Sequence, residues 1–291
     1  MLILISDAFD HSLPDTLTKF GEVTDDKSRI AEAEVVLIRS KTIVTKEYID
    51  SAQNLKLVIR GGVGLDNVDQ AYASARGIAV HNTPAASAIA VAECAFTLMI
   101  GITNHVGRAD SSMREGKWIK KELKRTELYR KTLGILGLGR IGTELAKRGA
   151  AFGMTVVAYD PLFDDSNYAD MKPEMKDVLN ISDYVSLHLP LVDSTTGIIN
   201  SETLQEFKDG SFLINTGRGK TIVEEDVADA LQSGKLSGFG NDVWYSDPPG
   251  SHPFADLPNV LMMPHLGAST KENLLRIGVI IENIINEYVN N

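Results

Sequence analysis

Three glycines spaced as GxGxxG constrain the fold of this chain more than any other feature. Gly137, Gly139 and Gly142 follow an apolar run, Thr132–Leu136, and precede a stretch with helical periodicity. In a strand–turn–helix unit the first glycine permits a tight turn, the second lets a ligand approach the backbone, and the third lets the helix pack on the strand. The N-terminus of the helix offers N–H groups and a positive dipole to phosphates. The pattern predicts a βαβ unit that binds the pyrophosphate of a dinucleotide.

The acidic residue expected of such a unit is also present. A second apolar run, Thr155–Tyr159, ends at Asp160, which lies 18 residues after Gly142 and so near the spacing typical of a ribose-binding acid. A carboxylate there accepts hydrogen bonds from both ribose hydroxyls and repels a 2′-phosphate. Asp160 therefore favours NAD over NADP. The alternative is a structural glycine turn with Asp160 as a solvated loop acid, but the complete βαβ context favours the cofactor site.

Strand and helix patterns alternate along most of the chain. These strand-like runs lack polar alternation, which suits parallel strands covered by helices on both faces. The remaining predicted strands are Leu2–Ser6, Val35–Arg39, Leu57–Arg60, Ile78–His81, Tyr184–His188, Phe212–Asn215, Gly238–Val243 and Val260–Met263. Alternating strands and helices indicate βαβ units, and hence an α/β fold.

The length of 291 residues suggests two domains of roughly 150 residues each. A helical segment from Ser87 to about Glu115 separates two groups of strands, and we expect the change of domain inside it, near Gly101. The periodic stretch Thr270–Val289 follows the last strand and is expected to cross back to the first domain. The sequence thus predicts one domain of residues 1–100 plus 267–291, around a second of residues 101–266.

Composition excludes several classes of function. The net charge of −10, from 29 Lys and Arg against 39 Asp and Glu, argues against a nucleic-acid or anionic-membrane surface, which needs clustered positive charge. The single cysteine, Cys94, excludes an internal disulfide framework and a Cys-based zinc site, and no metal site is expected. No targeting signal is visible, and the apolar run Ile89–Ile102 is shorter than the ~20 residues of a spanning helix. We expect a cytoplasmic protein.

Four segments that follow predicted strands carry side chains able to do chemistry. In an open α/β sheet the carboxyl ends of the strands line the ligand crevice. The segments are Leu187–Pro190, Asn215–Gly219, Asp242 with Asp247 beyond it, and Pro264–Gly267. An arginine can hold a carboxylate, a histidine can take a hydroxyl proton, and an acid can orient the imidazole and raise its pKa. One arginine, one acid and one histidine at such ends match the oxidation of a 2-hydroxy acid.

Each of these residues also has a structural interpretation. Arg218 could be a surface arginine in a glycine turn, and His265 a histidine satisfied within the fold after a proline. Asp247, in the segment YSDPPG, could simply start a turn. His188 falls within a strand pattern and fits a structural role better than a catalytic one. The combination behind one dinucleotide-binding unit favours catalysis.

The chain resembles the D-isomer-specific 2-hydroxyacid dehydrogenase family, and within it the phosphoglycerate dehydrogenases most of all. The matching stretches, in family order, are RGGVGLDNVD (Arg60–Asp69), VHNTP (Val80–Pro84), GKW (Gly116–Trp118), KTLGILGLGRIG, LHLPL, NTGRG, DVW and PHLGASTKE (Pro264–Glu272). The resemblance implies a Rossmann NAD-binding domain inserted into a flavodoxin-like substrate domain built from both chain ends. It also implies a homodimer formed largely through the crossover helix.

The resemblance assigns site residues as well. It implies that Arg218 binds the substrate, that His265 is the acid–base, and that Asp247 is its acid partner. Asp242 is expected to contact the nicotinamide carboxamide. Further cofactor contacts are implied at Thr83, Arg140, Ile141, Leu189, Thr216, Gly217 and Gly267.

On the substrate side, the resemblance implies that Val63 and Gly64 offer backbone N–H groups to the substrate carboxylate. Phosphoglycerate dehydrogenases place an arginine at the position of Arg60, where it can meet the substrate's phosphate; the alternative is a basic residue that caps the strand Leu57–Arg60. The first candidate is therefore the pair 3-phosphoglycerate and 3-phosphohydroxypyruvate, in serine biosynthesis. Glyoxylate, hydroxypyruvate and D-lactate dehydrogenases of the family are the alternative, and a non-catalytic NAD sensor is a third possibility.

Two features depart from the family pattern. The family usually has Glu at the position of Asp247, and Asp is one methylene, about 1.5 Å, shorter, so its hydrogen bond to His265 is expected to be long or water-mediated. Slower turnover or a lower acid–base pKa would follow. Longer phosphoglycerate dehydrogenases carry a C-terminal regulatory domain, whereas this sequence ends at Asn291 directly after the expected return helix. Control through such a domain is not expected.

Overall fold

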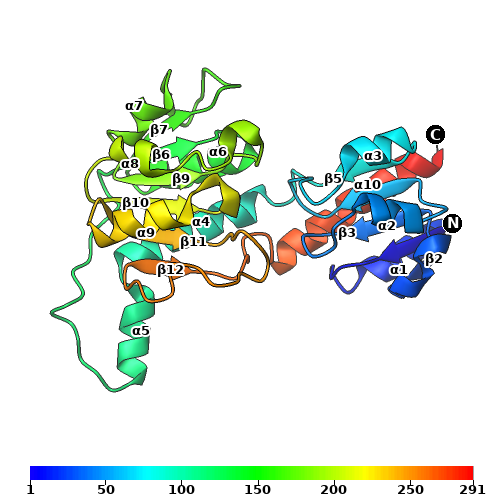
Figure 1. Cartoon of the computed structure of the whole chain (residues 1–291), viewed down its shortest axis with the longest axis horizontal. Helices are drawn as coiled ribbons and strands as arrows, with labels where there is room; N and C mark the ends of the chain where they lie inside the picture. The colour runs from blue at the N-terminus through cyan, green and yellow to red at the C-terminus, as the bar shows by residue number, and fades with distance from the viewer. Residues whose placement is uncertain (291) are drawn as a thin grey trace. The chain divides into compact units, whose positions relative to one another are not determined.

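The computed structural model describes residues 1–290 and divides into two compact units (Figure 1). One unit is Met1–Ala88 together with the chain from Ala268 on, and the other is Ile89–Gly267. The first division falls at the start of helix α4 (Ala88–Thr103) because this helix buries Ala92 and Leu98 in the core of the second unit. The expected limit near Gly101 lies within the same helix.

The first unit contains a five-stranded parallel sheet with the order β2-β1-β3-β4-β5. Its strands are β1 (Leu2–Ile5), β2 (Glu22–Thr24), β3 (Val35–Ile38), β4 (Leu57–Arg60) and β5 (Ala79–Asn82). The helical segments are α1 (Leu13–Leu17), η1 (Thr18–Phe20), η2 (Lys27–Glu32), α2 (Lys46–Ser51), α3 (Gln70–Ala75) and α10 (Lys271–Asn290). This strand order is that of flavodoxin-like folds, as the family resemblance implied.

Helix α10 belongs to the first unit although it follows the second in the chain. Its Ile277, Ile281 and Ile285 are fully buried in one cluster with Ile3 and Leu37 of the sheet. Their spacing of four residues places all three on one face of the helix. The apolar periodicity that predicted a returning helix thus reflects this buried face.

The second unit contains a seven-stranded parallel sheet with the order β12-β11-β10-β9-β6-β7-β8. Its strands are β6 (Thr132–Leu136), β7 (Thr155–Tyr159), β8 (Asp170–Met171), β9 (Tyr184–Leu187), β10 (Ser211–Asn215), β11 (Leu236–Asn241) and β12 (Val260–Met262). The helical segments after α4 are α5 (Val106–Arg114), α6 (Arg140–Ala151), α7 (Met175–Leu179), η3 (Asp193–Thr195), α8 (Ser201–Gln205), η4 (Gly219–Thr221) and α9 (Glu224–Gln232). Strand order reverses between β6 and β9, as in a Rossmann fold.

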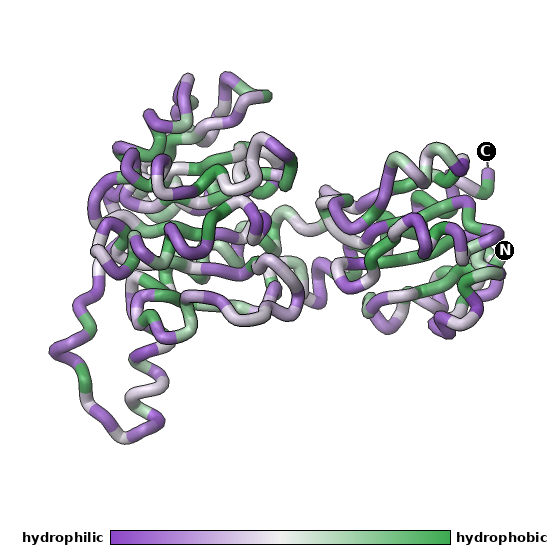
Figure 2. Tube along the Cα trace, in the orientation of Figure 1, coloured by the Kyte–Doolittle hydropathy of each residue, from purple (hydrophilic) through white to green (hydrophobic). Residues whose placement is uncertain are grey.

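Helices cover both faces of this second sheet. Helices α4 and α6 pack in one hydrophobic cluster, and α7, α8 and α9 pack in another. In Figure 2 the interior of this unit is largely green, that is hydrophobic, as expected for strands covered on both faces, whose sequences lack polar alternation. The predicted α/β fold with two doubly wound parallel sheets is confirmed.

Two strands, β2 and β8, were not predicted. Both are short edge strands that include exposed acids, Glu22 and Asp170, so they lack the apolar run of a buried parallel strand. The inner strands of the second sheet end level with one another, since Leu136 pairs with Leu187 and Asn215 pairs with both Leu187 and Asn241. The segments that follow these strands therefore emerge together at one edge of the sheet.

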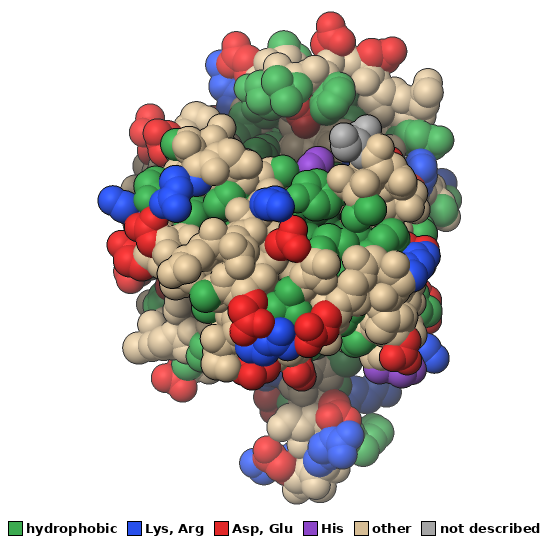
Figure 3. Space-filling model, turned by 90° about the vertical axis from the view of Figure 1, so that its right-hand side faces the viewer, with side chains coloured by type: hydrophobic (Ala, Val, Ile, Leu, Met, Phe, Trp, Pro, Cys, Tyr) green, Lys and Arg blue, Asp and Glu red, His purple; other side chains and the backbone are tan. Residues whose placement is uncertain are grey.

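Within the described residues, no single helix is long and apolar enough to cross a membrane. Helices α4 and α5 reach the necessary length and composition only as a pair bent by 62°, and α4 is a core helix of the second unit. On the face drawn in Figure 3, Lys and Arg side chains lie among Asp and Glu.

Candidate active site

The glycine-rich turn lies at the point where the strand order reverses, between the ends of β6 and β9. Gly137 has a φ of +92°, and a Cβ on it would lie 2.7 Å from the carbonyl oxygen of His188. A Cβ on Gly142 would lie 2.3 Å from the Gly137 carbonyl oxygen, whereas one on Gly139 would meet no described atom within 4 Å. The turn therefore has no room for a side chain at Gly137 or Gly142, whereas the space beside Gly139 is open. This fits a backbone that a pyrophosphate approaches.

Helix α6 starts directly at this opening. Its N-cap is Gly139, so no side chain caps the first turn, and the backbone N–H groups of Arg140 and Ile141 belong to the end with the positive dipole. This is the arrangement that binds phosphate in dinucleotide sites. The residues present therefore fit the pyrophosphate of NAD.

Asp160 follows β7 and lies against the same turn. Its Oδ2 accepts a hydrogen bond from the backbone N–H of Leu138 at 2.7 Å, and its Oδ1 accepts one from Leu162 at 2.9 Å. Each carboxylate oxygen retains a lone pair for a further donor. The structure thus places Asp160 beside the glycine-rich turn, while its contact with the ribose stays a prediction.

The loops after β9 and β10 lie at the same edge of the sheet as the glycine-rich turn. The buried side chain of Asn215 accepts a hydrogen bond from Gly217 N at 3.1 Å and donates one to Arg218 O at 3.0 Å. Among residues 1–290 the buried Thr216 hydroxyl has no hydrogen-bond partner, so it could serve a ligand. Leu189 is also buried here. Asn215 organises the turn that carries Arg218, a role that the sequence did not reveal.

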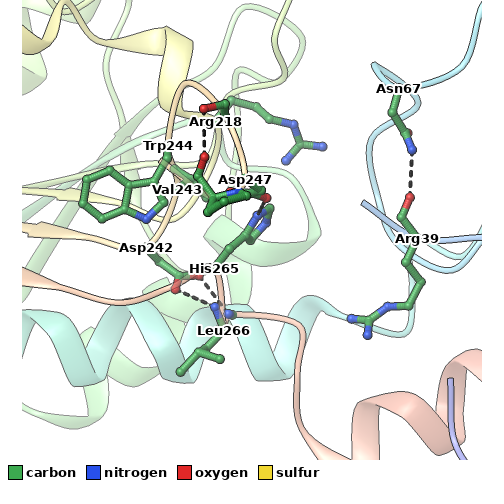
Figure 4. Close-up of polar contacts among 12 residues, drawn as sticks. Arg39, Asn67, Arg218, Asp242, Val243, Trp244, Asp247, His265 and Leu266 are labelled. Carbon is green, nitrogen blue, oxygen red and sulfur yellow. Dashed lines mark hydrogen bonds and ion pairs between the residues drawn. The ribbon is translucent and has the colours of Figure 1, made fainter. Parts of the chain in front are cut away.

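His265 and Asp247 make a direct hydrogen bond, between Nδ1 and Oδ2 (Figure 4). The expectation of a long or water-mediated contact is therefore wrong. The loop that follows β11 brings the backbone of Asp247 close enough for the shorter side chain to reach the ring. Both side chains are about one-third exposed, at 33% for His265 and 36% for Asp247. Because Asp247 engages Nδ1, the Nε2 atom is the one left to exchange a proton with a ligand.

Arg218 comes from a different loop and lies on the same side of the unit as this pair (Figure 4). Its carbonyl accepts a hydrogen bond from the hydroxyl of Thr221 at 2.7 Å, and one guanidinium nitrogen donates to the carbonyl of Gly217 at 2.9 Å. The structure therefore brings together Arg218, Asp247 and His265, which the sequence separates by up to 47 residues.

Asp242 is almost fully buried and is hydrogen-bonded to the backbone of the two residues that follow His265. Its two carboxylate oxygens accept hydrogen bonds from Leu266 N at 2.7 Å and Gly267 N at 2.8 Å. Burial raises the pKa of the Asp242 carboxyl above its ordinary value, and the two N–H donors oppose that rise. This bracing role was not predicted, because it joins two loops whose geometry no local pattern encodes. A contact with the nicotinamide carboxamide stays a prediction.

The predicted residues of the first unit cluster at the ends of β4 and β5. Arg60 is buried, and its guanidinium donates a hydrogen bond to the carbonyl of Gly64. The side-chain amide of Asn82 donates to the carbonyl of Val63, and the fully buried Thr83 donates its backbone N–H to Gly62 O at 2.9 Å. Arg60 thus helps to shape the loop that holds Val63 and Gly64.

Two further groups fit structural roles. His188 Nε2 lies 2.9 Å from the Ser186 hydroxyl, and burial lowers the pKa of His188 to about 4, so its ring is neutral near pH 7. Burial raises the pKa of the Cys94 thiol to about 12, which keeps it protonated and unreactive. Residues 1–290 contain no group of three or more His, Cys, Asp or Glu side chains placed to hold a metal ion.

Comparisons with known proteins identify the family of this chain. The model of the D-isomer specific 2-hydroxyacid dehydrogenase, NAD binding domain family matches residues 96–267, more than half of the chain. The chain is 44% identical over 262 residues to a hydroxypyruvate reductase of Thermotoga maritima, covering 89% of this chain and 86% of that protein. It is 38% identical over 291 residues to a D-3-phosphoglycerate dehydrogenase of Methanocaldococcus jannaschii, covering 96% of this chain but only 56% of that protein.

Solved structures give the same result. A D-lactate dehydrogenase from Aquifex aeolicus, complexed with NAD and lactic acid, superposes with a TM-score of 0.88 at 27% identity. The match covers 100% of this chain and 96% of that one. Both sheets of that fold are therefore present, and the predicted cofactor, NAD, is confirmed by the family match. The chain belongs to the D-isomer specific 2-hydroxyacid dehydrogenase family and is an NAD-dependent oxidoreductase.

Proposed function

We propose that His265 is the acid–base of this dehydrogenase, with Asp247 as its partner and Arg218 as the substrate-binding arginine. The observation that carries the proposal is the direct His265–Asp247 hydrogen bond on the side of the unit where Arg218 lies. Arg218 binds the carboxylate of the substrate through its planar fork of N–H groups.

The proton and the hydride then follow separate routes. During oxidation His265 Nε2 takes the proton of the C2 hydroxyl, and during reduction the same atom returns it to the carbonyl oxygen. Asp247 holds the ring through Nδ1 and stabilises the imidazolium that forms. Bound at the glycine-rich turn, NAD would provide the hydride acceptor for oxidation and, as NADH, the hydride donor for reduction.

The first candidate substrate pair is 3-phosphoglycerate and 3-phosphohydroxypyruvate. It is supported by the buried cation Arg60 in the segment RGGVGLDNVD and by relatives such as the M. jannaschii phosphoglycerate dehydrogenase. The second candidate is hydroxypyruvate, with glyoxylate and D-lactate beside it. It is favoured by the T. maritima relative, whose length is similar, and by the hydrogen bond that commits part of the Arg60 guanidinium to its own loop.

A panel of 2-keto acids followed at the NADH absorbance distinguishes these candidates. If the first is correct, kcat/KM for 3-phosphohydroxypyruvate exceeds that for hydroxypyruvate, glyoxylate and pyruvate. Arg60→Ala then lowers the phosphorylated acid's value by about 10-fold to 100-fold more than the values of the other acids, as expected for loss of a charge-assisted hydrogen bond. Arg76→Ala, which removes an exposed arginine paired with Asp50 in the same unit, is the matched control.

Three other outcomes would each contradict a part of this proposal. If Arg60→Ala changes the values of all the acids equally and the phosphorylated acid is not preferred, phosphoglycerate is ruled out and hydroxypyruvate is favoured. Tight NADH binding without turnover on any acid of the panel favours a sensor. A preference for NADPH over NADH contradicts the role given to Asp160.

We also propose that the protein is a homodimer formed through the region of α4 and α5. Helices α4 and α5 expose large apolar side chains, with Met113 57% exposed, Val106 52% and Ile89 43%, and such groups are common at protein interfaces. Light scattering should give twice the mass of one chain. Met113→Glu should lower that mass, whereas Val279→Glu, at a residue 58% exposed on α10, should not. A wild-type mass of one chain would contradict the proposal.

A further inference from the structure

The backbone at His265 adopts a conformation that needs outside support. Its φ is +57°, in the left-handed region that residues other than glycine seldom occupy. Such a conformation persists where surrounding contacts hold it. The contacts that hold His265 in place are therefore part of what sets its orientation.

Hydrogen bonds hold the backbone both before and after His265. After it, Asp242 accepts hydrogen bonds from Leu266 and Gly267. Before it, the indole Nε1–H of Trp244 donates to the carbonyl of Met263 at 3.0 Å. Figure 4 shows Trp244 and Asp242 in the same turn after β11, with His265 beside them.

The backbone ladder of β12 stops just before His265. Strand β12 ends at Met262, and Pro264, the residue after Met263, has no N–H with which to continue the ladder toward His265. On its other side, the backbone N–H of Met263 still donates to Asn241 O at 2.8 Å. The hydrogen bond from the Trp244 indole therefore holds the backbone at the end of β12, two residues before His265.

The ring of Trp244 is itself held in place. It packs against the core cluster of the second unit, and its centroid lies 4.7 Å from that of His252. Its backbone is also closely packed, because a Cβ on Gly219 would lie 2.1 Å from the Trp244 carbonyl carbon. Gly219 directly follows Arg218, so Trp244 lies between the loop of the arginine and the loop of the histidine.

We propose that Trp244 is a positioning residue for the reaction. Its indole N–H fixes the Met263 carbonyl and so sets the direction of the His265 ring relative to Asp247 and to the Arg218 loop. Its main effect is on turnover and not on the binding of NAD. This inference rests on the proposed role of His265.

The test removes the N–H and keeps an aromatic ring. Trp244→Phe is compared with Trp118→Phe, which makes the same change at a tryptophan that is 75% exposed. Trp244→Phe should lower kcat by about 10-fold or more, since small errors in the placement of a reacting group cost up to about 100-fold. The KM of the keto acid and the Kd of NADH should stay within about 2-fold. Trp118→Phe should leave all three unchanged.

A double variant separates positioning from general damage. If Trp244 acts through His265, adding Trp244→Phe to His265→Ala should lower kcat no further, because coupled residues are not additive. A further loss of the full size seen in the single variant would overturn the proposal, as would wild-type kcat in Trp244→Phe. An active His265→Ala would instead overturn the proposed function.

A second variant removes the indole N–H without relying on correct folding of Trp244→Phe. Benzothienylalanine has the shape of tryptophan without the N–H, and it can be incorporated into the Trp118→Phe protein, where it replaces Trp244 alone. The same fall in kcat, with NADH affinity unchanged, is expected. A kcat equal to that of Trp118→Phe would overturn the proposal.

Discussion

His265→Ala is expected to lower kcat by about 1,000-fold, in the middle of the range for loss of a general acid–base. The substitution removes Nε2, the ring nitrogen that Asp247 leaves available, and no proton then moves with the hydride. NADH binding should stay near that of wild type, because the glycine-rich turn and Asp160 lie on other loops. Single-turnover reduction of a keto acid, with a separate fluorescence titration of NADH, measures both effects.

Asp247→Glu is the conservative comparison for this variant. It keeps the carboxylate and restores the residue usual in the family, so it should keep or raise activity. Since Asp247 already contacts Nδ1 directly, the added methylene is not needed for reach, and we expect a change of only a few-fold. If His265→Ala has full activity, the acid–base assignment fails whatever Asp247→Glu does.

Much of the fold was predictable because buried parallel strands leave a strong pattern. The runs at β6, β7 and β4 have the predicted limits, since each is mostly apolar and is followed directly by a glycine or an acid. Strands β2 and β8 gave no such signal. They are short, lie at sheet edges and include exposed acids.

The candidate site residues could be named one by one from the sequence, but their arrangement could not. Arg218 and His265 each follow a strand, and the level ends of the parallel strands bring such residues together. The contacts that orient them run between loops, as in the bonds of Asp242 to Leu266 and of Trp244 to Met263. Loop-to-loop contacts have no period in the sequence, which is also why the reach of Asp247 was misjudged.

Two alanine substitutions in the glycine-rich turn should separate cofactor binding from folding. Gly142→Ala places a Cβ 2.3 Å from the Gly137 carbonyl oxygen and 3.2 Å from Ile135. Neither neighbour is the flexible end of a long side chain, so α6 must move. Overpacking of this kind costs about 1–3 kcal/mol, and the Tm should fall together with NADH affinity.

Gly139→Ala should separate the two effects. Its Cβ would meet no described protein atom within 4 Å, so the Tm should stay near that of wild type. The new methyl group would instead occupy the opening where the pyrophosphate approaches, and the Kd of NADH should rise by about 10-fold to 100-fold, a cost of about 1.4–2.8 kcal/mol.

Gly107→Ala, whose Cβ would make an ordinary contact of 3.6 Å with Leu261, is the control for both properties. Thermal melts and NADH fluorescence titrations of the three variants decide the matter. If Gly139→Ala binds NADH as wild type does, the pyrophosphate does not approach the turn at this residue. A loss of affinity at unchanged Tm would show that space, and not stability, is what this glycine provides.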